Sequence, residues 1–180
     1  MTIYSIGHST RTLDELIALL REHDVTRLAD VRRYPGSRRY PHFSREALQR
    51  SLPDHGILYE HFEDLGGRRR PDANSPNTFW ENPQFRAYAD YMATPEFHAA
   101  VDRLLASDRV TAYMCAEAVP WRCHRNLLSD ELVRRGIEVR HIVGPRSAQP
   151  HALHRNAKIA GDHLIYTPSQ EALDFGSYNS

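Results

Sequence analysis

The sequence predicts an α/β protein, built as a single three-layer domain with a mostly parallel sheet of about five strands and helices on both faces. Short β-prone runs alternate with helical stretches, and the connections between strands are long enough for helical crossovers. At 180 residues the chain fits one well-filled domain and is short for two. We expect residues 1–143 to form the core domain, and residues 144–180 a C-terminal arm packed on the core or extending from it.

The first strand is predicted over residues 2–9, where apolar and polar residues alternate. The helix that follows, over residues 12–24, has leucine and isoleucine at helical spacing. Thr12 is its N-cap, and Glu15, three residues on, completes a capping box.

The next elements continue the alternation of strands and helices. One strand is expected over residues 27–36, running out into a loop, and another over residues 57–62. Between them, Ser44 caps a helix over residues 44–56. Glycine, proline and asparagine are frequent in residues 66–83, which are therefore predicted to form a long loop.

The second half of the chain supplies three more helices and two more strands. Two helices are predicted over residues 84–94 and 95–107, and Pro95 suits the first turn of the second helix. The remaining elements are a buried strand over residues 109–117, a helix from Trp121 to Gly136 and a strand over residues 137–144. From Pro145 onward the sequence has no strong period.

The composition is that of an ordinary globular protein, with 41% hydrophobic and 26% charged residues. The formal net charge is zero, which excludes a general electrostatic attraction to nucleic acid or anionic membrane. No apolar run approaches the ~20 residues that span a bilayer, and the N-terminal residues lack the features of a signal peptide. We therefore expect a cytoplasmic protein without a membrane partner.

Arginine supplies nearly all of the positive charge, because Lys158 is the only lysine. A planar guanidinium binds phosphate or carboxylate through two parallel hydrogen bonds, so clusters of arginine are candidate ligand contacts. The chain has two cysteines, Cys115 and Cys123, and in a cytoplasmic protein both are expected to be reduced.

Polar and reactive side chains accumulate directly after the predicted strands. The carboxyl ends of parallel strands lie at one edge of the sheet, where open α/β proteins bind their ligands. The segments concerned are Gly7–Ser9, Asp30–Arg33, His61–Gly67 and Cys115–Glu117. We expect His8, Asp30, Arg32, Glu117 and Arg125 to face one shared cleft.

Several stretches of the chain resemble one known family, the domain of unknown function 488. They are YSIGHST, DVRRYPGSRRYPHF, YEHFEDLGGRR, NPQFRAYADYM and MCAEAVPWRCHR, which together span roughly residues 3 to 143. The resemblance implies a compact α/β domain and points to the same edge of the sheet. It implies no established activity.

The two cysteines lie in different predicted settings. Cys115 ends a strand and is expected to be buried and inert. Cys123 falls in about the first turn of the helix expected from Trp121, where the helix dipole, Arg122 and Arg125 would stabilise its thiolate. Cys123 is therefore predicted to have a low pKa. The residues expected nearest to the chemistry are Cys123, His124, Glu117 and His8.

Two families of cysteine enzymes fit the spacing poorly. A cysteine phosphatase needs five residues between its cysteine and its arginine, but six separate Cys115 from Arg122. Glu117 would also repel a phosphate held in that loop. A rhodanese-like sulfur carrier needs a short loop after its cysteine without such a glutamate.

A metal site is a further alternative. Cys115, Cys123, His124 and His8 offer ligands suited to zinc or iron. Seven residues separate the two cysteines, so the close pair typical of zinc ribbons is missing.

The arginines of three loops fit a phosphorylated or carboxylated ligand best. The expected ligand contacts are Asp30, Arg32, Arg38, Arg39, Arg68, Arg122, Arg125 and Cys115. Asp30 and Glu117 could orient these arginines, bind a ribose hydroxyl or act as general base. Nearby aromatic residues could stack on a base, and these are Tyr34, Tyr40, Phe43, Trp80 and Trp121.

Two classes of function follow. The first is an enzyme or binder that acts on a small phosphorylated or nucleotide-like ligand in the cleft. The alternative is a nucleic-acid-binding module that holds phosphates with its arginine-rich loops. Rising salt concentration should weaken nucleic-acid binding steeply, and should weaken the binding of a small ligand in the cleft much less. The sequence requires no cofactor.

Overall fold

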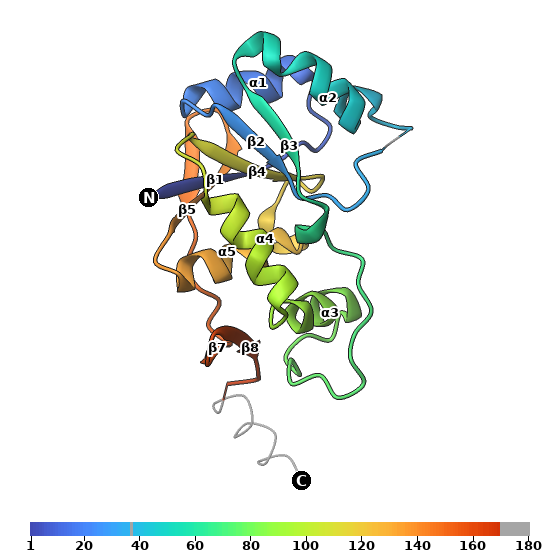
Figure 1. The fold of residues 1–180 in the computed structure, drawn as a ribbon, viewed down its shortest axis with the longest axis vertical. Helices are drawn as coiled ribbons and strands as arrows, with labels where there is room; N and C mark the ends of the chain where they lie inside the picture. The colour runs from blue at the N-terminus through green and yellow to red at the C-terminus, as the bar shows by residue number, and fades with distance from the viewer. Residues whose placement is uncertain (37, 170–180) are drawn as a thin grey trace.

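The computed structural model describes residues 1–36 and 38–169, and these form the predicted α/β architecture (Figure 1). Their main sheet has six strands in the order β3–β2–β4–β1–β5–β6. The first five pair in parallel, and β6 runs antiparallel to β5. The strands are β1 (Thr2–Gly7), β2 (Arg27–Asp30), β3 (Leu58–His61), β4 (Thr111–Cys115), β5 (Glu138–Gly144) and β6 (Ser147–Pro150). All five predicted strands are therefore confirmed.

Helices cover both faces of this sheet. On one side, α1 and α2 pack against the strand residues Ile6, Leu28 and Met114. On the other, α3, α4 and α5 pack against strand residues that include Ile3 and Tyr113. The helices are α1 (Leu13–Glu22), α2 (Arg45–Ser51), α3 (Pro83–Tyr91), α4 (Pro95–Leu105) and α5 (Arg125–Arg134).

The expected caps form as the sequence predicts. The Thr12 hydroxyl accepts from the backbone N–H of Glu15 at 3.1 Å, and the Glu15 carboxylate reaches back to the N–H of Thr12. The Ser44 hydroxyl caps α2, and Pro95 stands in the first turn of α4. These local signals set where α1, α2 and α4 begin.

The predicted helix start at Trp121 is wrong. Residues Pro120–Arg122 form a 3₁₀ turn, Cys123 has extended backbone angles, and α5 begins only at Arg125. Pro120 favours the first position of the turn, and the turn delays the helix. Cys123 therefore lies before α5 and not in its first turn.

The described part of the C-terminal arm packs closely on the core. Beyond β6, the strands β7 (Ala157–Ala160) and β8 (His163–Tyr166) form a hairpin, and Tyr166 of β8 is fully buried. The buried Asp130 carboxylate of α5 binds the His151 ring at 2.7 Å and accepts from the Tyr166 hydroxyl at 2.8 Å. Residues 170–180 of the expected arm lie outside the described residues.

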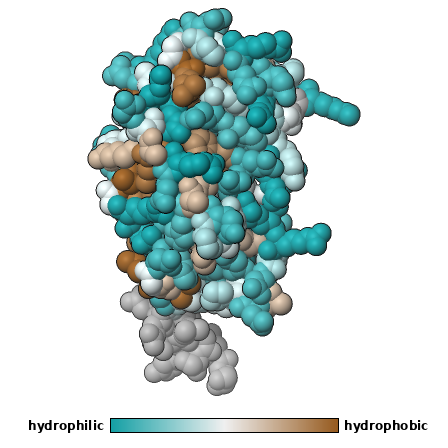
Figure 2. Space-filling view, in the orientation of Figure 1, coloured by the Kyte–Doolittle hydropathy of each residue, from teal (hydrophilic) through white to brown (hydrophobic). Residues whose placement is uncertain are grey.

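The surface in Figure 2 is mostly hydrophilic, and its apolar residues form small separate groups. Among the residues that the structure describes, no helix is long and apolar enough to cross a membrane.

Gly7 allows two loops to meet at the carboxyl edge of the sheet. A Cβ atom added at Gly7 would lie 1.7 Å from the carbonyl oxygen of Glu117. Beside it, the backbone N–H groups of His8 and Ser9 donate to the carbonyls of Cys115 and Ala116 at 3.0 and 2.9 Å. A glycine is therefore required where the loop after β4 crosses the end of β1.

Substitution of Gly7 should damage both stability and the site. We expect Gly7→Ala to lower the free energy of unfolding by about 2 kcal/mol or more, because the backbone of Glu117 has to move. Urea unfolding measures the effect. Gly144→Ala is the matched control, since a Cβ added there meets nothing within 4 Å. Equal stability of the two variants would contradict the close loop contact.

Candidate functional site

A cleft lies at the carboxyl edge of the sheet, as expected for a sheet of parallel strands. It consists of two adjoining pockets that share residues of the loops after β2, β3 and β4. The first has a volume of about 290 Å³ and is lined by Arg32, Arg33, Tyr34, Gly67, Arg68, Gln84, Phe85, Cys115, Ala116, Glu117, Arg122, Cys123 and His124. The second, of about 400 Å³, extends past Arg32, Tyr34 and Arg68 to His8, Ser9, Thr10, Gly36 and Tyr40.

Most of the predicted site residues line this cleft. The first pocket brings together Arg32, Arg68, Cys115, Glu117, Arg122, Cys123 and His124, and His8 lines the second. Asp30 and Arg125 are buried beneath the surface. Arg38 and Arg39 are exposed and line neither pocket, so the structure does not bring these two together with the others.

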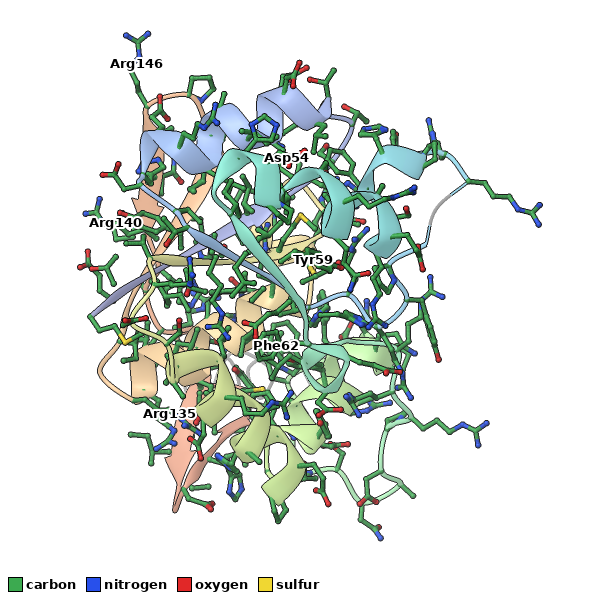
Figure 3. The ribbon with its side chains drawn as sticks, turned by 45° about the horizontal axis from the view of Figure 1, so that its top comes forward. Asp54, Tyr59, Phe62, Arg135, Arg140 and Arg146 are labelled. Atoms are coloured by element: carbon green, nitrogen blue, oxygen red, sulfur yellow. The ribbon has the colours of Figure 1, made fainter. Side chains whose placement is uncertain are left out.

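Asp30 holds Arg32 in place. Its carboxylate accepts from Nε and Nη2 of Arg32 at 2.8 and 2.6 Å and from the Tyr59 hydroxyl at 2.5 Å. Figure 3 shows Tyr59 reaching into the interior from β3. Burial lowers the pKa of Arg32, but the hydrogen bonds and the charge of Asp30 raise it by more. The net shift of this pKa is therefore upward. Asp30 therefore orients an arginine; it has no exposed surface with which to contact a ligand.

His8 is a neutral acceptor next to this ion pair. Its Nε2 lies 3.3 Å from Nη1 of Arg32, and its Nδ1 lies 2.9 Å from the carbonyl oxygen of Ser9. Because arginine can only donate, the ring proton belongs on Nδ1. Burial lowers the pKa of His8 to about 4. His8 also stacks on Phe43, with ring centroids 4.6 Å apart, so its ring is fixed on three sides.

His124 is fixed in a similar way in the first pocket. Its Nε2 lies 3.2 Å from the carbonyl oxygen of Val31, which places the ring proton there and leaves Nδ1 as an acceptor. Nδ1 faces Cys123, 3.5 Å from its sulfur. Burial lowers the pKa of His124 to about 4. A Cβ at Gly67 would lie 3.1 Å from Nδ1, so the glycine leaves space for the ring.

Arg125 is a buried cation without a carboxylate partner. It is 1% exposed and donates only to the carbonyl oxygens of Glu117 and Ala118, at 3.1 and 3.4 Å. Its Nε and Nη1 have no hydrogen-bond partner among the described residues. A buried charge of this kind is costly unless a counter-charge lies close by. The sequence placed Arg125 in the cleft, but the structure places it under the loop that forms the cleft wall.

The pKa shifts of the two thiols are the reverse of those that the sequence predicts. Burial raises the pKa of Cys115, but the Cys123 thiol, the Arg125 charge and the Glu117 backbone together bring it below its ordinary value. The hydrogen bond to Cys115 and burial raise the pKa of Cys123 well above its ordinary value. The predicted low pKa of Cys123 is therefore wrong. The backbone N–H and the charge of Arg125 do lower the pKa of Cys123, as expected near a helix start, but Cys115 and burial outweigh them.

The metal alternative receives no support from the geometry. The described residues contain no group of three or more histidine, cysteine, aspartate or glutamate side chains that could hold a metal ion. His8 faces Arg32 in the second pocket, while His124 and Cys123 lie side by side in the lining of the first. The proposed ligand set is thus divided between two pockets.

Sequence reasoning missed part of the lining of the first pocket. Gln84 and Phe85 come from the first turn of α3 and reach the site from about thirty residues before Cys115 in the chain. The signal that could have identified them is the cap of Asn82 followed by Pro83, which fixes where the first turn of α3 begins. Arg33 belongs to the same wall and follows Arg32 directly.

The fold and the site define a class: a single α/β protein with an arginine-lined, cysteine-containing cleft at the carboxyl edge of its sheet. The family described as domain of unknown function DUF488 has a sequence model that matches residues 12–132, and the chain belongs to this family. No curated protein and no solved structure is significantly similar to the chain.

The order of alkylation of the thiols should follow their pKa values. We expect iodoacetamide at about pH 7 to modify Cys115 before Cys123, because only the thiolate reacts. Peptide mass spectrometry over time measures both sites. Cys115→Ser should remove the fast phase, and Cys123→Ser should retain one. Faster labelling of Cys123 would contradict the assignment.

The buried ring of His124 should make stability depend on pH. Its pKa in the folded state is about 4, below its ordinary value of 6.5, so the unfolded chain binds the proton first. Stability present above pH 6.5 is therefore lost as the pH falls toward 4, by up to about 1.4 kcal/mol per pH unit. Urea unfolding at a series of pH values should show a flatter slope for His124→Gln. An unchanged slope would contradict the neutral, buried ring.

Proposed function

We propose that the cleft binds a small phosphorylated or nucleotide-like ligand, and that the protein acts on this ligand as an enzyme. The proposal rests on a set of arginines on the cleft wall that form no ion pair with a carboxylate of the described residues. Arg33, Arg68 and Arg122 line the first pocket and form no ion pair within the described ranges. The whole chain has zero net charge, so this local excess favours an anionic ligand.

The three arginines differ in their contacts and in their exposure to solvent. Arg33 donates to the carbonyl oxygen of Arg68 at 3.1 Å, which links the loops after β2 and β3. The guanidinium groups of Arg33 and Arg68 each lie 5.7 Å from the centre of the Tyr34 ring. Arg122 is exposed on the 3₁₀ turn before α5. A ligand phosphate can therefore be held between two linked arginines and one exposed arginine.

The other residues of the pocket supply groups for chemistry. Cys115 offers a thiol with a lowered pKa, and His124 offers a neutral imidazole beside Cys123. The Glu117 carboxylate is exposed at the boundary of both pockets and is a candidate general base. The exposed ring of Tyr34 provides a face on which a nucleobase can stack. We therefore favour Cys115 over Cys123 as the nucleophile.

Binding of nucleic acid is the second candidate function. A groove of about 790 Å³ adjoins the first pocket and is lined by Arg33, Arg68, Arg69 and Arg70. Acidic residues share this groove, namely Asp72 and Asp90, and the Arg69 guanidinium lies 3.3 Å from the centre of the Tyr91 ring. These features favour a small ligand over an extended phosphate backbone.

Loss of one cleft arginine should weaken phosphate binding. We expect inorganic phosphate and a ribonucleoside monophosphate to raise the melting temperature of the protein, and Arg122→Gln to weaken binding about tenfold, since a hydrogen bond between charged groups is lost. Calorimetric titration measures the affinity.

Arg146→Gln is the matched control, because Arg146 is exposed, lines neither pocket of the cleft and points away from the molecule (Figure 3). Equal affinity of both variants, or no binding by the wild type, would contradict the proposal. Tight binding of a single-stranded oligonucleotide that falls steeply with salt would favour the second candidate instead.

A further inference from the structure

The only two cysteines of the chain meet at one end of the first pocket. Cys115 ends β4, and the 3₁₀ turn Pro120–Arg122 brings the chain back so that Cys123 joins Cys115 in one buried cluster on the wall of this pocket. Both side chains are buried, at 2% and 7% exposure, yet both line the pocket. Two free thiols that share one buried cluster and line one pocket are a candidate pair for a disulfide.

The buried guanidinium of Arg125 supplies a reason for one thiol to ionise. Its Nε and Nη1 lack hydrogen-bond partners among the described residues, and its charge lowers the pKa of both thiols, although at Cys123 burial and Cys115 outweigh it. Within the described part of the chain, Arg125 has no ion pair with a carboxylate. A Cys115 thiolate is an anion that the site itself can form to balance this buried charge.

We propose that Cys115 and Cys123 are a redox-active dithiol that reduces a small hydroperoxide, with Cys115 as the attacking and Cys123 as the resolving thiol. The pocket of about 290 Å³ and the burial of both sulfur atoms favour a small oxidant such as hydrogen peroxide. This activity goes beyond the binding of a phosphorylated ligand and does not depend on it.

The reaction takes place in two balanced steps. In the first, the Cys115 thiolate attacks one oxygen of hydrogen peroxide, the O–O bond breaks, and the leaving hydroxide takes a proton from solvent to become water. Cys115 is then a sulfenic acid. In the second, the sulfur of Cys123 attacks the sulfur of Cys115, the S–O bond breaks, and a disulfide and a second water form. A low-molecular-weight thiol restores the two cysteines by thiol–disulfide exchange.

His124 is placed to accept the proton that Cys123 must lose in the second step. Its Nδ1 lies 3.5 Å from the Cys123 sulfur and has no proton of its own, because the Nε2 proton is donated to Val31. From Nδ1 the proton can pass to the leaving hydroxide. The raised pKa of Cys123 makes such a base necessary, since the thiol is otherwise protonated at neutral pH.

The test is a titration of the reduced full chain with hydrogen peroxide. We expect both free thiols to disappear together, the intact mass to fall by two hydrogen atoms, and peptide mapping to show a Cys115–Cys123 disulfide that dithiothreitol reverses. Cys115→Ser should leave Cys123 unoxidised. Cys123→Ser should stop at a Cys115 sulfenic acid, which dimedone traps.

Two further variants separate the roles of the neighbouring residues. Arg125→Gln should slow sulfenic acid formation about tenfold at neutral pH, because the thiolate fraction falls. His124→Gln should leave that step unchanged and slow disulfide formation, a split that a merely structural role would not produce. If Arg125→Gln does not fold, the His124→Gln result still tests the mechanism.

Three results would overturn the inference: thiols that survive peroxide, a disulfide only between two chains, or a trapped sulfenic acid on Cys123. Phosphate binding measured on the same samples distinguishes this inference from the proposed function. Normal phosphate binding without disulfide formation would overturn the dithiol alone, and disulfide formation without phosphate binding would overturn the ligand proposal alone.

Discussion

The buried ion pair of Asp30 and Arg32 is the interaction on which the cleft depends. Arg32 also donates to the carbonyl of Phe43 at 2.7 Å and contacts His8, so one guanidinium connects the segments after β1 and β2 with the turn before α2. Removal of either partner would leave an uncompensated buried charge, which typically costs about 3–5 kcal/mol. The cleft wall is therefore held in place by a charge pair within the protein.

Arg32 and Arg125 show how the environment decides the role of a residue type. Arg32 has a carboxylate beside it, so its charge is satisfied and it orders the backbone. Arg125 is more deeply buried and, among the described residues, has only carbonyl acceptors, so its charge lowers the pKa of the neighbouring thiols. The first arginine fixes the shape of the site, and the second changes the reactivity of a neighbouring group.

The parts of the structure that depend on local signals could be predicted from sequence. The strands alternate with helices, and caps such as Thr12 and Ser44 form as expected, because their partners are three residues away. The cleft at the carboxyl edge also followed from the alternation of strands and helices, because this alternation implies parallel strands. The properties of Cys115 and Cys123 could not be predicted, because they depend on a 3₁₀ turn and on contacts between the two thiols. Gln84 reaches the pocket through the tertiary packing of α3; Asn82 and Pro83 mark where α3 begins, but not what its first turn packs against.

The contacts of Asp130 determine where a fragment of this chain that folds on its own can end. The family match stops at residue 132, but the partners of Asp130 lie beyond it, in His151 and Tyr166. Leu164 is also fully buried in the core beneath α5. A fragment cut at the family boundary would lose β5 from the sheet and leave a buried carboxylate without its donors. The smallest unit able to fold alone therefore extends at least through β8.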